Sequence, residues 1–440
     1  MHTILLCGGS GQRLWPLSNH IRSKMFLELL PSPGGGRESM IGRVSRQLVR
    51  KGLGSSALFV THKDQLGLTR RYTKDCFPVI GEPYKRGTFT AAALGAVYLH
   101  STGQAKLDET ICVAPADMFA DDDFFEHFRV FPDILKTSQA DIALLGTRPT
   151  HPSDQYGYIV PGLAASSEYS SVIRFEEKPV KLRAQALIQD NALWNCGVFA
   201  FSLRFILSYL DQMGLPTDFA ELTAQYPALP VRSFDKEVVE RTPNIAVIRH
   251  EGEWRDLGSW TSLTEQLHET VIGKGGIRGE SRNTNIVNEL DAPLYVLGVS
   301  DIVAVASPDG ILIASKETAN GIKEILGGSS VYPVYGETIW GSYSVLDRSG
   351  SELHAVLTIK LAILSDHHTK ELFSRDCSKV WTVVSGDGDV ILNGSAYPAR
   401  VGDVFSIAAG VRHEIRAFTA MEWIEVRIGK ERVDEALYVS

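Results

Sequence analysis

The sequence of 440 residues lacks any apolar run of the 18 or more residues that a membrane-spanning helix requires. The apolar stretch nearest its start, residues 4–7, is short and has no basic segment before it, so we expect no signal peptide. The five cysteines are scattered and form no Cys-x-x-Cys pair, which argues against a disulfide framework and a cysteine-bound zinc site. We therefore expect a cytoplasmic protein with no membrane partner.

Positively charged residues are fewer than negatively charged ones. The chain has 44 Lys and Arg residues against 52 Asp and Glu residues, for a net charge of -8. A protein that binds nucleic acid is expected to be basic, so we expect no nucleic-acid partner, although a few local cations can still hold a small anionic substrate. Neither a Walker motif nor the Rossmann spacing Gly-x-Gly-x-x-Gly is present.

The first 270 residues alternate between strand-like and helix-like patterns. Short buried apolar runs predict strands at 3–7, 57–61, 110–114, 141–146 and 170–175. Helices are expected at 39–49, at 88–100 and from about residue 122. This alternation predicts an α/β domain over residues 1–275, with a mixed, mostly parallel sheet.

From about residue 276 the helical periodicity fades and short strands separated by turns take over. Strands are expected at 284–288, 294–299, 302–307 and 310–315, which indicates a β-rich linker domain over 276–335. A junction rich in aromatic residues follows at 327–344. Beyond it, strands expected at 353–364, 380–385, 389–392, 403–407 and 423–426 predict a small all-β sandwich or barrel over 336–440. Its expected core residues are Val383, Val390, Leu392, Val404 and Ile407.

The clearest motif directly follows the first predicted strand. It reads Gly8-Gly9-Ser10-Gly11-Gln12-Arg13-Leu14-Trp15-Pro16-Leu17. Glycines permit positive φ and let backbone N–H groups crowd around phosphate oxygens, and the guanidinium of Arg13 adds a permanent positive charge for the same oxygens. The segment therefore predicts a phosphate-binding loop.

Further motifs follow in an order typical of one family. They are Arg22-Ser23-Lys24-Met25-Phe26-Leu27, Glu82-Pro83-Tyr84-Lys85-Arg86-Gly87-Thr88, Pro115-Ala116-Asp117-Met118, Tyr156-Gly157-Tyr158-Ile159, Phe175-Glu176-Glu177-Lys178-Pro179, Trp194-Asn195-Cys196-Gly197-Val198-Phe199 and Trp254-Arg255-Asp256-Leu257-Gly258-Ser259-Trp260. Over the whole chain they resemble the mannose-1-phosphate guanylyltransferases among the nucleoside-diphosphate-sugar pyrophosphorylases. The resemblance implies a Rossmann-like nucleotidyltransferase domain, then a small β linker domain and, as in the bifunctional long form, an all-β cupin domain.

The resemblance also implies a reaction of GTP with a sugar 1-phosphate, most simply mannose 1-phosphate, that yields a GDP-sugar and pyrophosphate. The sugar phosphate would attack the α-phosphorus in line with the departing pyrophosphate, so catalysis would consist of positioning and charge neutralisation. Lys24 would contact the α-phosphate and pyrophosphate oxygens. The nucleotide-binding residues implied by the resemblance are Gly8, Gly9, Ser10, Gly11, Gln12, Arg13, Arg86, Thr88 and Asp117.

Two aspartates are expected to hold Mg²⁺. Asp117 follows the strand at 110–114, and ligands bind at the carboxyl ends of parallel strands. Asp256 follows another strand, and the two carboxylates could share an octahedral ion with phosphates and waters. Taken singly, each aspartate is also typical of a helix N-cap or a turn.

The resemblance assigns the sugar phosphate to a second group of residues. Lys178 would bind the phosphate, Glu177 and Asn195 would bind sugar hydroxyls, and Gly157 would let the backbone approach the sugar. Asp235 matches an acidic position near the sugar, although a helix N-cap is an equal interpretation for this residue.

Three residues depart from the family pattern and leave the exact base and sugar open. Gly87, between Arg86 and Thr88 of the implied base pocket, stands where an asparagine or aspartate is common. Met25 replaces a common glutamine, and Ser23 replaces a proline.

The C-terminal cupin of bifunctional relatives holds a divalent metal and isomerises mannose 6-phosphate with fructose 6-phosphate. Here Lys379 stands at the glutamate ligand position, where a cation would repel a metal ion. His413 matches the last ligand, but His367 and His368 come about seven residues too early, and adjacent strand residues face opposite sides. We therefore expect a degenerate cupin that packs, dimerises or steadies the catalytic domain.

Besides a metal-dependent isomerase, which the missing cupin ligands argue against, two alternatives remain open at this stage. The first is the same chemistry on another sugar 1-phosphate or on a cyclitol phosphate of specialised metabolism. The second is a catalytically silent, nucleotide-binding regulatory subunit, although the survival of Arg13, Lys24, Asp117, Lys178 and Asp256 together argues against it. We expect a homodimer.

Overall fold

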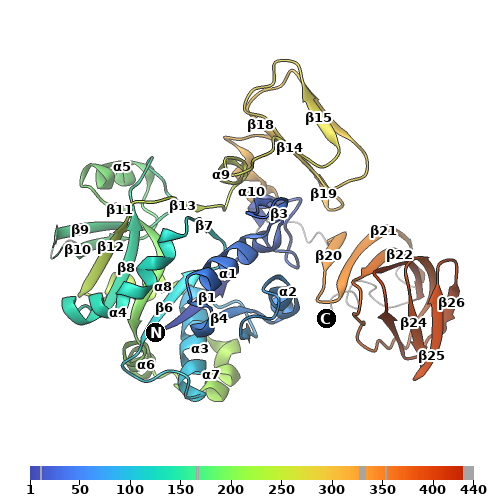
Figure 1. Cartoon of the computed structure of the whole chain (residues 1–440), viewed down its shortest axis with the longest axis horizontal. Helices are drawn as coiled ribbons and strands as arrows, with labels where there is room; N and C mark the ends of the chain where they lie inside the picture. Colours follow the sequence, from blue (N-terminus) through green and yellow to red (C-terminus); the bar gives the residue numbers. More distant parts are fainter. Residues whose placement is uncertain (10–11, 165, 167, 327–332, 352–353, 430–440) are drawn as a thin grey trace. The chain divides into compact units, whose positions relative to one another are not determined.

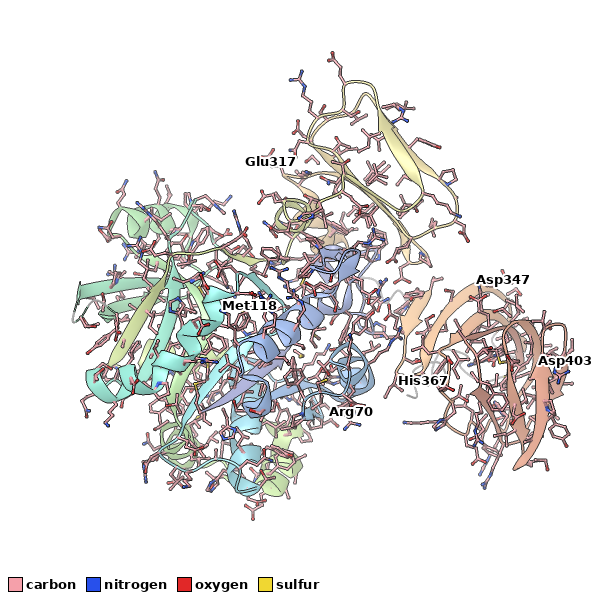
Figure 2. All side chains as sticks on the ribbon, viewed as in Figure 1. Arg70, Met118, Glu317, Asp347, His367 and Asp403 are labelled. Carbon is pink, nitrogen blue, oxygen red and sulfur yellow. The ribbon has the colours of Figure 1, made fainter. Side chains whose placement is uncertain are left out.

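The computed structural model describes residues 1–9, 12–164, 166, 168–326, 333–351 and 354–429. Figure 1 traces the chain, and Figure 2 adds its side chains. The chain divides into two compact units, of which the first comprises residues 1–10 and 25–267 and the second comprises residues 11–24 and 268–440. The segment 11–24, which contains Arg13 and Lys24, thus belongs with the C-terminal half of the chain.

A nine-stranded sheet forms the centre of the first unit, in the order β5-β4-β1-β6-β11-β8-β12-β10-β9. The strands are β1 (His2–Cys7), β4 (Ala57–His62), β5 (Val79–Glu82), β6 (Thr110–Pro115), β8 (Ile142–Thr147), β9 (Tyr158–Ala164), β10 (Ser170–Glu176), β11 (Leu193–Ser202) and β12 (Ile245–His250). Only β10 and β11 run against the others, because β11 pairs antiparallel with both β6 and β8, and β10 with both β9 and β12. The predicted mixed, mostly parallel sheet is confirmed.

Helices cover the sheet of this unit. They are α1 (Met40–Arg50), α2 (Leu66–Tyr72), α3 (Thr88–Ser101), α4 (Glu126–Ser138), α5 (Lys181–Gln189), α6 (Leu203–Gln212), α7 (Phe219–Gln225), α8 (Phe234–Glu237) and α9 (Trp260–Thr264). Ser39 caps α1, since its side chain accepts a hydrogen bond from the Gly42 N–H, and a cap of this kind begins the helix where the sequence predicted. The helix expected from about residue 122 instead begins with a 3₁₀ turn, Asp123–Phe125, before α4.

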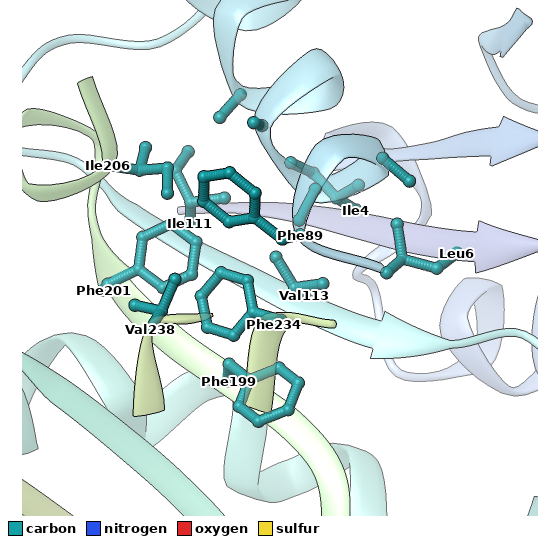
Figure 3. Close-up of a cluster of buried hydrophobic side chains, with 14 of the residues drawn as sticks. Ile4, Leu6, Phe89, Ile111, Val113, Phe199, Phe201, Ile206, Phe234 and Val238 are labelled. Atoms are coloured by element: carbon teal, nitrogen blue, oxygen red, sulfur yellow. The ribbon is translucent and has the colours of Figure 1, made fainter. Parts of the chain in front are cut away.

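The main core lies between the sheet and α3 (Figure 3). Ile4 and Leu6 of β1 and Ile111 of β6 pack there with Phe89 of α3 and Phe234 of α8. Helix α3 is apolar on all sides because it contacts the sheet on one side and α6, α7 and α8 on others. Strands buried on both faces explain why the sequence shows continuous apolar runs rather than alternation.

After residue 267, the second unit forms two small sheets whose strands are mostly parallel. One contains β14 (Val271–Ile272), β16 (Asn285–Asn288) and β18 (Ile302–Ser307), with β19 (Gly310–Ser315) added antiparallel. The other contains β15 (Gly275–Arg278) and β17 (Leu294–Leu297). The chain alternates between the two sheets around a small core, and α10 (Ile322–Leu326) follows. The expected β texture of this region is confirmed.

The described residues between 336 and 429 form strands and the turns between them, as the all-β prediction for 336–440 expects. Sheets of six and three strands contain β20 (Tyr335–Glu337), β21 (Gly341–Ser351), β22 (His354–Ile363), β23 (Cys377–Ser385), β24 (Asp387–Leu392), β25 (Ser395–Arg400), β26 (Val404–Ile407), β27 (His413–Ala417) and β28 (Met421–Gly429). Val383, Val390 and Ile407 are core residues, and Leu392 packs against them. The prediction for Val404 was wrong, since its side chain is 62% exposed. Residues three apart on one strand face opposite sides, so Val404 and Ile407 cannot both point inward.

The junction expected at 327–344 lies partly outside the described residues, and its later part forms β20 and the start of β21. Across the described residues, no helix combines the length and the apolar character needed to cross a bilayer.

Candidate active site

The predicted phosphate loop begins where β1 ends. Gly8 and Gly9 are exposed, and Gly9 has a φ of +127°, which glycine adopts far more readily than other residues. Among the described residues, no heavy atom beyond the chain neighbours lies within 4 Å of where a Cβ on either glycine would stand, so these residues leave room for ligand atoms beside this backbone. Ser10 and Gly11 lie outside the described residues, and a 3₁₀ turn, Gln12–Leu14, follows them.

The segment that carries Arg13 and Lys24 is anchored within the second unit. Asn19 Nδ2 donates to Asp309 Oδ2 at 2.7 Å, and Ser307 Oγ donates to the carbonyl oxygen of Pro16 at 2.7 Å. These contacts tie both ends of the motif that follows Arg13 to the linker strands.

Arg22 of this segment is held by two carboxylates. Its guanidinium lies 2.9 Å from Glu289 Oε1 and 2.8 Å from Glu337 Oε1, and it covers the ring of Tyr335. Burial opposes the charge on Arg22, but Glu289 and Glu337 outweigh burial and raise the pKa of its guanidinium. A buried cation with two carboxylate partners has a fixed geometry, so Arg22 holds the chain two residues before Lys24. The sequence analysis assigned no such role to Arg22.

Strand pairing brings the two predicted metal ligands together. β7 (Met118–Ala120) and β13 (Trp254–Asp256) form an antiparallel ladder in which Asp256 lies opposite Met118, and Asp117 immediately precedes Met118. Opposite residues in such a ladder have Cα atoms about 5 Å apart, so the backbones at Asp117 and Asp256 are close in space. The helix N-cap interpretation is wrong for Asp256, because Ser259 caps α9.

The carboxylate of Asp117 also acts on the thiol at the end of β1. The pKa of the Cys7 thiol is raised well above its ordinary value, first by burial and then by the negative charges of Asp117 and Glu82. Strand pairing agrees with this, because the Ala116 N–H donates to the Leu6 carbonyl oxygen at 3.0 Å, and Glu82 ends β5 of the same sheet. Asp117 therefore follows the strand beside β1, near the place where the glycine loop begins.

The five predicted sugar-phosphate residues form one cluster in the first unit. Lys178 Nζ lies 3.0 Å from Glu177 Oε1 just after β10, and Asn195 Nδ2 of β11 donates to Asp235 Oδ1 of α8 at 2.8 Å. A Cβ on Gly157 would stand 2.7 Å from Glu177 Oε2 and 2.8 Å from Phe175 Cζ, so a larger residue there would displace one of these side chains. The Asn195 N–H donates to the Gly157 carbonyl at 2.9 Å, which closes the cluster.

An irregularity in β11 aims Asn195 into this cluster. The pairing of β11 with β8 shifts register between Asn195 and Val198, and the Gly197 N–H donates to Asn195 Oδ1 at 3.1 Å. Bulges of this kind commonly redirect a side chain beside a binding site. Sequence spacing alone does not reveal the bulge.

Asp235 is electrostatically unusual. Burial and the neighbouring charge of Glu177 raise its pKa from the ordinary 3.8 to about 7, despite Lys178 and the hydrogen bond from Asn195. The helix N-cap interpretation of Asp235 is wrong, since Ser233 caps α8 by accepting from the Lys236 N–H. A carboxyl in a cluster of polar groups with a perturbed pKa is typical of a functional site.

The residues expected to line the base pocket also have structural roles. Arg86 donates through Nη2 to the carbonyl oxygen of Pro227, and Thr88 Oγ1 accepts from the Phe234 N–H at 2.9 Å. Gly87 has a φ of +91°, and a Cβ there would stand 2.2 Å from the carbonyl oxygen of Arg232. This close approach favours a glycine at position 87, whereas a base-pocket role for Arg86 and Thr88 stays a prediction.

Sequence reasoning gave no role to Glu82, the last residue of β5. The side chain is buried, Tyr226 Oη donates to Glu82 Oε2 at 2.9 Å, and burial raises the pKa of Glu82. Its position directly after an apolar strand was the available signal, because that is the sheet edge at which ligands bind.

In the second unit, Lys379 occupies the place where the cupin pattern expects a ligand. Its Nζ lies 2.8 Å from Nε2 of His413, and both side chains are buried. Burial and the charge of Lys379 lower the pKa of His413 to about 4. His367 and His368 are exposed, and Figure 2 shows His367 at the periphery of the barrel. Among the described residues, no three His, Cys, Asp or Glu side chains gather as a metal site.

Comparison with known proteins identifies the family. The model of a family described as nucleotidyl transferase matches residues 2–271, more than half of the chain. The chain belongs to the nucleotidyl transferase family. The matched residues include the glycine loop, the Asp117–Asp256 pair and the whole sugar-phosphate cluster of this nucleotidyl transferase.

The resemblance proposed from the motifs is confirmed by individual relatives. The nucleotidyl transferase is 27% identical to the alginate biosynthesis protein AlgA of Pseudomonas fluorescens over 98% of this chain and 93% of the relative. It is 25% identical to the mannose-1-phosphate guanylyltransferase RfbM of Salmonella typhimurium over 97% and 94%. A solved structure described as mannose-1-phosphate geranyltransferase from Thermus thermophilus matches with a TM-score of 0.60 and 27% identity, over 74% of this chain and 98% of that chain.

Proposed function

We propose that the protein is a guanylyltransferase that makes a GDP-sugar and pyrophosphate from GTP and a sugar 1-phosphate, with mannose 1-phosphate as the first candidate acceptor. The observation that carries this proposal is the convergence of Gly157, Glu177, Lys178, Asn195 and Asp235, which supply one cation and several hydroxyl-binding groups to a single place. The similarity to mannose-1-phosphate guanylyltransferases supports the choice of sugar.

The reaction needs positioning and charge more than covalent chemistry. An oxygen of the sugar 1-phosphate forms a bond to the α-phosphorus of GTP, and the bond from that phosphorus to the bridging oxygen of pyrophosphate breaks on the opposite side. The protein has to hold the two phosphates in line and to offset the negative charge that grows on the leaving group. No group of the protein has to gain or lose a covalent bond.

Each proposed residue has a distinct task. Lys178 holds the attacking sugar phosphate, and Glu177 orients Lys178 and accepts from sugar hydroxyls. Arg13 and Lys24 supply positive charge to the GTP phosphates, and the backbone after β1 supplies N–H donors. The side chain of Lys178 is 57% exposed, against 7% for Glu177, so the lysine is accessible to an incoming phosphate while its partner is fixed.

Asp117 and Asp256 fit a hard divalent cation. The β7–β13 ladder brings the backbones of these two residues close together, and Mg²⁺ is commonly held by one or two carboxylates together with substrate phosphates. When bound, the ion would neutralise charge on the nucleotide phosphates.

The first experiment measures pyrophosphate release with Mg²⁺, crossing the four nucleoside triphosphates with a panel of sugar and cyclitol phosphates. Release that requires GTP and mannose 1-phosphate would support the full proposal. Release with a different acceptor would keep the chemistry and change the substrate.

Variants make this test specific to the site. Asp117→Asn should lower the rate about 10²- to 10³-fold, as for loss of one transition-state contact, whereas Asp154→Asn on the exposed surface should not. If the wild-type protein releases no pyrophosphate with any member of the panel, the regulatory-subunit alternative would instead be favoured.

A further inference from the structure

A second cavity in the first unit lies outside the cluster described above. It has a volume of about 560 Å³ and is bounded by α1, by the segment that follows α2, and by the hairpin of β2 (Leu30–Pro31) and β3 (Arg37–Glu38). A volume between about 300 and 1,000 Å³ is typical of small-molecule sites. We call this cavity the α1–α2 pocket; none of the proposed sugar-phosphate or metal residues lines it.

Positive charge dominates the lining of the α1–α2 pocket. Its cationic residues are Arg37, Arg46, Arg50, Arg71 and Lys74. Among the described residues, two carboxylates line it, Glu28 and Glu38, and Arg50 also pairs with Asp122 at 2.9 Å, which leaves an excess of two positive charges on a chain whose net charge is -8. Such a local concentration of cations against an acidic background attracts small anions.

One wall of the pocket is a single face of α1. Gly42, Ser45, Arg46, Val49 and Arg50 line the pocket and recur at spacings of three and four residues, which is the spacing of one helix face. Arg46 is fixed in orientation, because its Nη2 and Nε donate to Glu38 at 2.7 and 3.1 Å. The guanidinium of Arg46 is therefore held in place before any ligand arrives.

The remaining lining favours a molecule with a carbon body. Val49 is 57% exposed although it is apolar, and Tyr72 and Phe77 provide aromatic surface in the same pocket. Guanidinium groups match the oxygens of phosphate well, and an apolar wall favours a ligand that is more than a bare ion. We propose that the α1–α2 pocket binds a small organic phosphate at a site separate from the catalytic cluster.

Cys76 can report whether the α1–α2 pocket is occupied. Cys76 lines it and is exposed, whereas the other four cysteines of the chain are buried. A neutral thiol reagent, N-ethylmaleimide, should therefore label Cys76 far faster than the other thiols, and a Cys76→Ser variant should lose this fast phase. The labelling rate measures occupancy of the pocket and does not depend on turnover, so it is independent of the proposed enzymatic function.

The experiment compares the labelling rate without ligand, with glucose 6-phosphate, with glucose, with inorganic phosphate and with sodium chloride at matched ionic strength. If the dissociation constant is about 1 mM, about 5 mM glucose 6-phosphate fills five-sixths of the sites and slows labelling about sixfold. Glucose and sodium chloride should leave the rate unchanged, and inorganic phosphate should protect less well than the sugar phosphate.

Two double variants locate the effect. Arg37→Gln with Lys74→Gln removes two exposed cations from the pocket and should raise the half-protecting concentration at least about tenfold. Lys106→Gln with Lys136→Gln removes two exposed cations elsewhere and should leave protection intact. Each rate is compared with that of the same variant without ligand, because a change near Cys76 also alters its intrinsic reactivity.

Four results would overturn the proposal. They are an absence of protection by glucose 6-phosphate, equal protection by glucose or by matched salt, equal protection by inorganic phosphate, and unchanged protection in the pocket double variant.

Discussion

Replacing Asp235 by asparagine should make the protein more stable at neutral pH and less active. In the folded chain the pKa of Asp235 is raised from 3.8 to about 7, first by burial and then by the charge of Glu177. Between these two values the unfolded chain has lost the proton that the folded chain still holds. Stability is therefore complete below about pH 4 and falls as the pH rises to about 7.

The size of this loss follows from the two pKa values. Each pKa unit corresponds to about 1.4 kcal/mol, so the full difference is about 4 kcal/mol. Asp235 is partly exposed, and solvent reduces the interaction, so we expect about 2 kcal/mol at pH 8. Asparagine has nearly the same shape and keeps an oxygen that can accept from Asn195 Nδ2, but it never ionises. Asp235→Asn should thus match the wild type at pH 4 and exceed its stability at pH 8.

Thermal and urea unfolding across pH 4 to 8 measure this directly, with the exposed Asp154→Asn as a matched control. Turnover should fall about tenfold or more in Asp235→Asn, because the group that faces the predicted sugar loses its charge, and stabilised active sites commonly lose activity. A stability difference that does not change with pH, or the same pH trend in the control, would refute the argument from the Asp235–Glu177 pair.

Three further outcomes are expected. Arg22→Lys should lower kcat about 10- to 100-fold in the pyrophosphate assay with an intact thermal transition, since small displacements of catalytic groups are costly; unchanged kcat would exclude a positioning role. Gly87→Ala should lower the melting temperature much more than Gly103→Ala. Both glycines have a positive φ, but only at Gly87 would a Cβ stand against backbone atoms. Similar decreases in melting temperature for the two variants would contradict this argument. Lys379→Met should raise the pKa of His413 from about 4 toward its ordinary value, as measured by NMR titration, and a wild-type His413 that titrates near pH 6.5 would disprove the buried contact.

Much of the first unit could be predicted because local pattern and tertiary role agree there. The short apolar run predicts β1, and the glycines after it predict the turn that ends the strand. Helix α1 begins after Ser39, which is a residue type that commonly caps helices. The sugar cluster was predicted by resemblance, and the structure brings its five residues together. Asp117 and Asp256 could be named from the sequence, but their proximity depends on the β7–β13 ladder, which joins distant segments.

Other features could not be predicted because they depend on partners far away in the chain. Val404 has the residue type of a core position, but the face it presents depends on the register of β26. The bulge that redirects Asn195 appears only where β11 pairs with β8. The role of Arg22 depends on Glu289 and Glu337, which follow it by hundreds of residues.

The sequence by itself determined the order of elements, the glycine loop after β1, the family resemblance and the residue types of the predicted site, because these depend on local periodicity, turn chemistry and short motifs. Which charged side chains lie next to one another was decided only by the tertiary structure. It joined residues 11–24 to the second unit, set Lys379 against His413, raised the pKa of Asp235 through burial beside Glu177, and gathered cations around the α1–α2 pocket. Burial and charge separation are properties of the folded arrangement, and no local stretch of sequence contains them.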